Sequence, residues 1–186
     1  MIPRRAEELS DEEVIDLVLE GDADAFSILV RRHRSKVLRL GMSFFHDTDD
    51  AADFSQDVFV KAYTALGTFK RRSSFSTWLL RIGYNTAINA KQRKRDNLAL
   101  GPDDELMGDP GADESHERAA TIEAVRKAIA GLPQRQAVCV ELYFYYDLKY
   151  SEIAEITGFP VNTIKSHVFR AKKILRERLG DGQGVD

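Results

Sequence analysis

Hydrophobic residues recur along most of this chain at the three- and four-residue spacing of amphipathic helices. Ser10 and Glu13 have the spacing of a capping box, which predicts the start of a first helix. The same periodicity predicts a second helix that ends near Phe45, with Asp22 or Asp24 as its N-terminal cap. No segment shows the alternating pattern of a strand, so the predicted fold class is all-α.

Two more helices are predicted in the first half of the chain. After a break at residues 46–50, helical spacing resumes and is expected to end at Gly67. Residues 68–74 read TFKRRSS and predict a polar, basic loop. Ser74 or Ser76 is then expected to cap a long helix that ends near Arg95.

Charge is segregated along the chain, although the net charge of the 186 residues is only −3. Residues 58–95 contain nine Lys or Arg and no acid, residues 96–117 contain eight acids and no Lys or Arg, and residues 161–180 contain six Lys or Arg and one acid. Such basic segments are either ordinary solvated helix faces or surfaces that face phosphate, and the clean separation of sign favours the second. The acidic stretch has two Pro, three Gly and no helical spacing. We therefore predict two small helical domains, at 10–95 and 118–180, joined by an acidic flexible linker at 96–117.

Several function classes find no support in the sequence. The four histidines are scattered without metal-ligand spacing, and there is no phosphate-binding loop, so we expect no enzyme activity, no catalytic residues, no cofactor and no metal site. The single cysteine, Cys139, cannot form an internal disulfide and is expected to be a small core residue. The N-terminus is acidic, unlike a signal peptide, and no apolar run approaches the ~18 residues of a membrane span. The prediction is a cytoplasmic protein with no membrane insertion.

The helix predicted at 75–95 has one face that neither a core nor a plain solvated surface explains. Its polar and aromatic residues fall within an arc of ~80° on a helical wheel. These residues are Trp78, Arg81, Asn85, Asn89 and Gln92. Core packing of Trp78 and an ordinary solvated position for the two Asn residues remain alternatives. A Trp beside amides and Arg is nevertheless typical of a surface that stacks on exposed bases and reads their edges.

Residues 148–170 have the spacing of a helix-turn-helix. Ala154 lets the two helices approach, Gly158 is expected to take a positive φ in the turn, and Ile164 fills the joint. The second helix separates an apolar side from a polar, basic side of the kind that enters the DNA major groove. A generic helical hairpin with a solvated basic face is the alternative.

Four stretches, in this order, resemble the extracytoplasmic-function sigma factors of the bacterial sigma-70 family. They read AFSILVRRHRSKV, DFSQDVFVKAYTAL, FSTWLLRIGYNTAINAKQRKR and GLPQRQAVCVELYFYYDLKYSEIAEITGFPVNTIKSHVFRAKKIL. The resemblance covers residues 10–180 and implies a σ2-like domain, a linker and a σ4-like helix-turn-helix domain. It implies a protein that binds core RNA polymerase, through the β′ clamp helices and the β flap, and directs it to promoter DNA. It also implies an anti-sigma factor as regulator.

The helix faces described above and the resemblance together assign residues to three surfaces. The single-stranded −10 element is expected to contact Phe69, Lys70, Arg71, Arg72, Phe75, Trp78, Arg81, Asn85, Asn89 and Arg93. The −35 duplex is expected to contact Asn162, Thr163, Lys165, Ser166, His167, Arg170 and Lys173. The β′ clamp helices are expected to contact Asp53, Gln56, Asp57 and Phe59. The loop departs from the family pattern, because many members have a Gly and an acid after the Phe where this chain has Lys70 and Arg71.

The alternative function is a helix-turn-helix regulator that binds duplex DNA independently of polymerase. The basic, aromatic block at 69–95 argues against it, because such a regulator has no need of a surface for separated strands.

Overall fold

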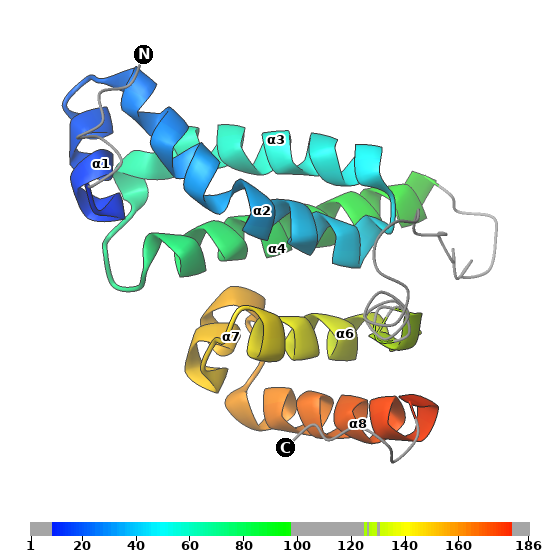
Figure 1. Ribbon diagram of the computed structural model, residues 1–186. Helices are drawn as coiled ribbons and strands as arrows, with labels where there is room; N and C mark the ends of the chain where they lie inside the picture. The colour runs from blue at the N-terminus through cyan, green and yellow to red at the C-terminus, as the bar shows by residue number, and fades with distance from the viewer. Residues whose placement is uncertain (1–8, 98–124, 126, 130, 180–186) are drawn as a thin grey trace, which may run out of the picture. The chain divides into compact units, whose positions relative to one another are not determined.

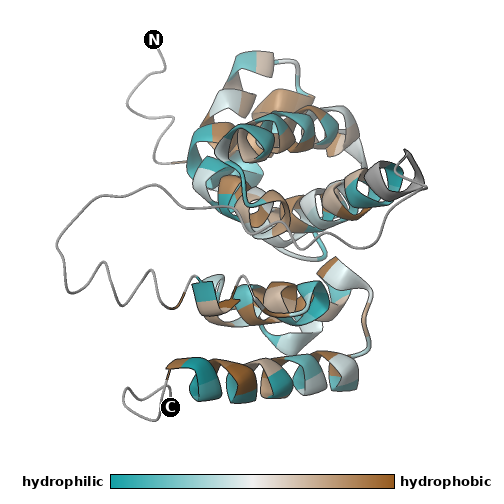
Figure 2. Cartoon of the chain, turned by 90° about the vertical axis from the view of Figure 1, so that its right-hand side faces the viewer, coloured by the Kyte–Doolittle hydropathy of each residue, from teal (hydrophilic) through white to brown (hydrophobic). Residues whose placement is uncertain are grey.

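The computed structural model describes residues 9–97, 125, 127–129 and 131–179. Every secondary-structure element within these residues is a helix, which confirms the all-α class (Figure 1). Hydrophilic and hydrophobic residues alternate along the helices, as their periodicity predicts (Figure 2). The chain divides into two compact units, Met1–Pro102 and Asp103–Asp186. Only Asp96 and Asn97 of the predicted linker belong to a described helix, and the rest of the linker lies outside the described residues.

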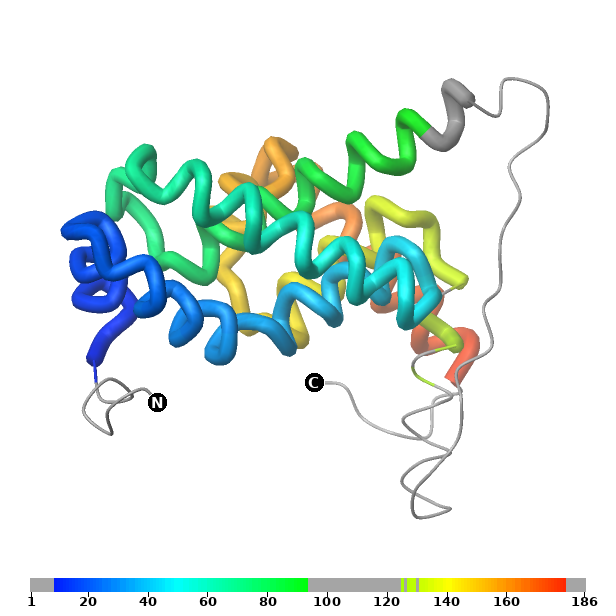
Figure 3. Tube along the Cα trace, turned by 90° about the horizontal axis from the view of Figure 1, so that it is seen from above, coloured from blue at the N-terminus to red at the C-terminus, as the bar shows by residue number. Residues whose placement is uncertain are grey.

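Three long helices that pack against one another form the first unit (Figures 1 and 3). They are α2 (Phe26–Phe45), α3 (Thr48–Ala65) and α4 (Phe75–Asn97). The short helix α1 (Asp11–Leu19) and the 3₁₀ turn η2 (Ala23–Ala25) pack against α2, and a second 3₁₀ turn, η3 (Leu66–Thr68), leads into the loop before α4. The side chains buried between these helices include Leu29, Leu40, Phe44, Val58, Ala62, Leu79 and Leu80.

Two glycines allow the long helices to approach closely. A Cβ on Gly41 of α2 would lie 2.8 Å from Cδ1 of Phe54 and 3.1 Å from Cα of Ala51, both in α3. A Cβ on Gly83 of α4 would lie 2.9 Å from Cδ2 of Leu40 in α2. Larger residues at these two positions would force the helices apart, since packed cores have few voids to absorb the added volume.

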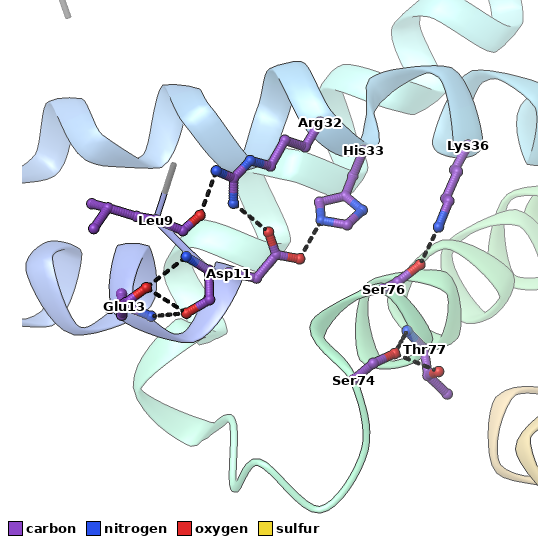
Figure 4. Close-up of polar contacts among 10 residues, drawn as sticks. Leu9, Asp11, Glu13, Arg32, His33, Lys36, Ser74, Ser76 and Thr77 are labelled. Atoms are coloured by element: carbon purple, nitrogen blue, oxygen red, sulfur yellow. Dashed lines mark hydrogen bonds and ion pairs between the residues drawn. The ribbon is translucent and has the colours of Figure 1, made fainter. Parts of the chain in front are cut away.

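Hydrogen bonds in the structure decide which of the predicted residues cap a helix. Ser10 and Glu13 form the reciprocal capping box of α1. Asp22, not Asp24, is a cap, although it caps η2 and so lies one turn before α2. Ser74 caps α4, because its side-chain oxygen accepts a hydrogen bond from the backbone N–H of Thr77 at 3.1 Å. The hydroxyl of Ser76 instead accepts a hydrogen bond from a lysine of α2 (Figure 4).

Two predicted helix boundaries can be compared with the structure: the helix end at Gly67 and the break at 46–50. α3 ends earlier, at Ala65, because the chain tightens into η3 and buries Leu66. The break is confirmed but shorter, because α3 already begins at Thr48: His46 takes a left-handed conformation (φ 56°) at the end of α2, and Asp47 caps α3.

The second unit contains α6 (Gln134–Val140), the π-helical turn η4 (Glu141–Tyr145), α7 (Tyr150–Thr157) and α8 (Val161–Leu179). Its core includes Leu132, Val138, Leu142, Ile153, Ile156, Ile164, Val168 and Ala171. Cys139 is buried, as predicted, and this burial raises the pKa of its thiol to about 11. The thiol is therefore protonated and unreactive at neutral pH.

Candidate nucleic-acid interfaces

The polar face predicted for α4 is exposed. Arg81, Asn85 and Asn89 are exposed along it, and Gln92 and Arg93 continue the exposed surface one turn further. The opposite side packs on α2 and α3 through Leu79, Leu80, Gly83, Thr86 and Ala87. Carboxamides both donate and accept hydrogen bonds, so the exposed Asn side chains have the chemistry that base edges require.

Three aromatic rings cluster at the start of this face. The ring centroid of Trp78 lies 5.2 Å from that of Phe69 and 5.8 Å from that of Phe75. Phe75 is only 3% exposed and also contacts the ring of His33 in α2, at 5.3 Å. Phe69 and Trp78 are partly exposed. The three rings therefore have different roles: Phe75 supports the other two from the core, and Phe69 and Trp78 present aromatic surface to solvent.

The three cations predicted in the loop differ in their surroundings. Lys70 and Arg72 are exposed and carry no ion pair among the described residues. Arg71 is ion-paired with Asp16 of α1 and adopts a positive φ of 54°. Two of the three loop cations are therefore free to meet phosphate, and the third is held by the protein itself.

The face predicted to dock on polymerase lies on α3. Asp53, Gln56 and Asp57 are exposed on one side of the helix. Phe59 does not belong to this face, because it is only 7% exposed and its ring lies edge-on to that of Phe26. Val60, which was not predicted, is 65% exposed there. Its position four residues after Gln56 is the sequence signal that could have identified it.

The polar side of α8 is also exposed. Asn162, Lys165, Ser166, Arg170 and Lys173 are exposed, and Thr163 and His167 are partly buried at its edge. The side facing the core carries Ile164, Val168 and Ala171. Phe169, which was not among the predicted contacts, lies one turn after Ser166 and is 71% exposed. Its large apolar ring among cations marks it as part of the same surface.

The turn before α8 has the predicted geometry. Gly158 ends α7 with φ 73°, and its N–H donates to the carbonyl of Ala154 at 2.9 Å. The carbonyl of Pro160 accepts the N–H of Ile164 at 3.1 Å, which begins α8. Ile164 is fully buried in the joint between the two helices. These contacts fix the direction in which the polar side of α8 points.

A cation from outside the helix-turn-helix extends this surface. The guanidinium of Arg135, in α6, lies 5.6 Å from the centroid of the Phe159 ring, which is edge-on to His167. Burial, with the charges of Arg170 and Arg135, lowers the pKa of His167. Its imidazole is therefore neutral at neutral pH. The sequence alone did not identify Arg135 as part of this surface, because its partner ring lies 24 residues away along the chain.

Other kinds of site find no support in the part of the chain that the structure describes. No group of three or more His, Cys, Asp or Glu in that part is arranged to hold a metal ion. None of its helices is both long and apolar enough to cross a membrane.

Comparisons with known proteins match both units. The sigma-70 region 2 family matches residues 29–96, and the sigma-70 region 4 family matches residues 122–175. The RNA polymerase sigma-H factor of Pseudomonas aeruginosa is 37% identical over 91% of this chain and 93% of its own. The ECF RNA polymerase sigma-E factor of Escherichia coli strain K12 is 34% identical over 94% of this chain and 96% of its own. This chain belongs to the extracytoplasmic-function group of the sigma-70 family.

Solved structures agree with the fold of this sigma factor. The sigma factor RpoE in complex with the anti-sigma factor NepR, from Bartonella quintana, has a TM-score of 0.70 at 23% identity, over 85% of this chain and 98% of its own. CnrH in complex with the cytosolic domain of CnrY has a TM-score of 0.67 at 24% identity, over 93% of this chain and 99% of its own. The two-domain, all-α architecture is therefore shared.

Membership in this family decides between the two functions that the sequence left open. A sigma factor confers promoter recognition on core RNA polymerase and takes part in transcription initiation. The presence of both region 2 and region 4 does not favour an independent duplex-binding regulator.

Proposed function

We propose that this sigma factor reads a promoter with two different surfaces. The α4 face and the preceding loop, residues 69–74, receive the separated non-template strand of the −10 element. The polar side of α8 reads the −35 duplex. The observation that carries the proposal is the exposed row of Arg81, Asn85 and Asn89, which begins beside the partly exposed rings of Phe69 and Trp78.

The energetics of strand separation are compatible with this arrangement. Extruding a base from a duplex costs a few kcal/mol. Stacking on an aromatic ring returns ~1–3 kcal/mol per base, and the exposed amides add hydrogen bonds to base edges. Lys70 and Arg72 supply charge for the phosphates on the loop side of the rings. The two free energies are close enough that capture of a single base matters for opening.

On the −35 element, the first turns of α8 would reach base edges in the major groove. Lys165 has the donor group that guanine acceptors require, and the ring of Phe169 offers an apolar contact for a thymine methyl. Arg135 and Lys173 would contact phosphates on either side and set the register without reading sequence.

Docking on polymerase is proposed to use the exposed side of α3. Asp53 and Asp57 give it negative charge, Gln56 adds an amide, and Val60 adds an apolar contact. Such a face suits a partner helix with basic residues, and the partner that we propose is the β′ clamp helices. The buried ring of Phe59 would support the α3 face from the core. The second unit is proposed to dock on the β flap. An anti-sigma partner is also proposed. One solved relative is a complex with the anti-sigma factor NepR, and the other is a complex with the cytosolic domain of CnrY.

The test compares Asn85→Ala with Asn162→Ala in the reconstituted holoenzyme. Transcription start sites mapped after induced expression supply the promoter, and permanganate reactivity of its thymines measures opening. Asn85→Ala should reduce opening and −10 discrimination but leave core binding unchanged. Asn162→Ala, the same substitution on the other reader, should instead weaken binding to the −35 duplex. Loss of core binding by Asn85→Ala, or equal effects of both variants on opening, would contradict the proposal.

A further inference from the structure

Arg71 is the one described residue of the loop 69–74 with a positive φ, and it has a long-range partner. Its φ of 54° is unfavourable for a residue with a Cβ and persists only where surrounding contacts enforce it. The side chain reaches Asp16, 55 positions earlier in the chain. Nη1 donates to Oδ2 of Asp16 at 3.3 Å and Nη2 donates to Oδ1, so the contact is bidentate.

The position of this ion pair links α1 to the proposed −10 reader. α1 contacts η3, which leads directly into the loop, and the two lie at the same end of the helical bundle (Figure 1). Phe69, two residues before Arg71, is the ring that lies against Trp78. Lys70 and Arg72, on either side of Arg71, are exposed, so neither side chain anchors this segment in the core.

We infer that Asp16 is a positioning residue of the −10 reader. Its carboxylate holds the Arg71 guanidinium, and thereby holds the loop in the conformation that places Phe69 against Trp78. This inference rests on the proposed function of α4 and the loop. It assigns to α1 an indirect part in base reading, through the loop that Asp16 holds.

The alternative role for Asp16 is simple repulsion of nucleic acid by a surface acid. Repulsion predicts that any neutralised acid on this side of α1 strengthens DNA binding by a similar amount. Positioning predicts the opposite for Asp16 alone, because its loss frees the loop. Glu20 is the matched control: it is exposed, it lies one helical turn after Asp16, and the acids that act on Arg71 are Asp16 and Glu12.

The first experiment uses the fluorescence of Trp78, which is the only tryptophan of the 186 residues. In the full-length protein, Asp16→Asn should raise the acrylamide quenching constant of Trp78 by about twofold, the size of change expected when an exposed ion pair no longer holds a loop. Glu20→Gln should leave it at the wild-type value. The charge exchange Asp16→Arg with Arg71→Asp should restore it. A wild-type quenching constant in Asp16→Asn would overturn the inference.

The second experiment tests the consequence for base reading. Holoenzymes carrying wild-type protein, Asp16→Asn or Glu20→Gln select from single-stranded non-template oligonucleotides randomised across the −10 element. Enrichment of the preferred base should fall by about twofold or more in Asp16→Asn alone. Unchanged enrichment, or tighter binding in both variants, would overturn the inference in favour of no role or of repulsion. If even the wild type enriches no base, the proposed function of α4 fails, and the quenching result still decides whether Asp16 positions the loop.

Discussion

The two surfaces that we propose to read the promoter differ in how the protein holds them in place. The α8 surface is one side of a continuous helix, set in place by a turn a few residues away at Gly158 and Pro160. The −10 surface combines a loop with α4 and depends on distant support: the ring of Phe75 rests on His33 of α2, and Arg71 is held by α1. A duplex offers a regular groove that a rigid helix fits. A single strand has no fixed shape, so the surface that binds it has to be preorganised by the protein.

The largest effect that separates the two surfaces should come from Phe44→Ala. Phe44 is 1% exposed in α2 and lies edge-on to Tyr84 of α4, at 5.9 Å. Such a truncation costs about 3–5 kcal/mol, a large part of the stability of a small domain. Urea unfolding followed by Trp78 fluorescence should shift to lower concentration, and promoter opening should be lost. Binding of the −35 duplex should survive, and its loss would show that the two units do not fold separately.

Ile164→Ala is the reciprocal change in the second unit. Ile164 is fully buried between α7 and α8, and removing its side chain should cost about 2–5 kcal/mol. Duplex binding should weaken because α8 is no longer fixed against α7. The unfolding transition of Trp78 should remain where it is in the wild type. A shift of that transition would mean that the first unit depends on the second for its stability.

Lys165→Ala tests the α8 surface without disturbing its fold. The side chain is exposed, so stability should not change, whereas affinity for the −35 duplex should fall by ~1–3 kcal/mol. Fluorescence anisotropy with the cognate duplex, and with duplexes altered at single base pairs, measures the loss. A loss of the same size for every sequence would place Lys165 on phosphate instead of on a base edge.

The difference between the surfaces also explains how far each was predictable from sequence. Gly158, Ile164 and the exposed side of α8 followed from spacing, because a helix-turn-helix is specified by residues within a few turns of each other. The same periodicity placed Arg81, Asn85 and Asn89 correctly on the exposed side of α4.

Periodicity fails where a distant segment decides the environment of a side chain. Phe59 and Phe75 were predicted as contact residues, but α2 covers both through Phe26 and His33. Arg71 was predicted to contact the −10 element, but α1 supplies an acid for it. Helical spacing identifies a face of a helix without identifying the neighbouring helix that covers it, so these three assignments needed the tertiary structure.

Acid should weaken the first unit through His33, with a smaller effect than the substitutions above. Burial lowers the pKa of His33 below its ordinary value of 6.5, although the carboxylate of Asp11, 2.6 Å away, opposes this shift (Figure 4). The unfolded chain then binds more protons than the folded one below pH 6.5, so stability falls as the pH drops toward the pKa of the folded state. For one proton the slope is at most about 1.4 kcal/mol per pH unit.

Urea unfolding followed by Trp78 fluorescence, repeated between neutral pH and pH 5, measures this dependence. His33→Gln keeps a polar side chain beside Asp11 but does not titrate, so it should flatten the profile in this range. Asp11 does not contribute here, because burial would raise the pKa of its carboxyl but hydrogen bonds from Arg32 and His33 lower it overall, below its ordinary value of 3.8. Stability that rose on acidification would show instead that the ion pair with Asp11 outweighs burial. His33 would then stabilise the support beneath Phe75 in its charged form.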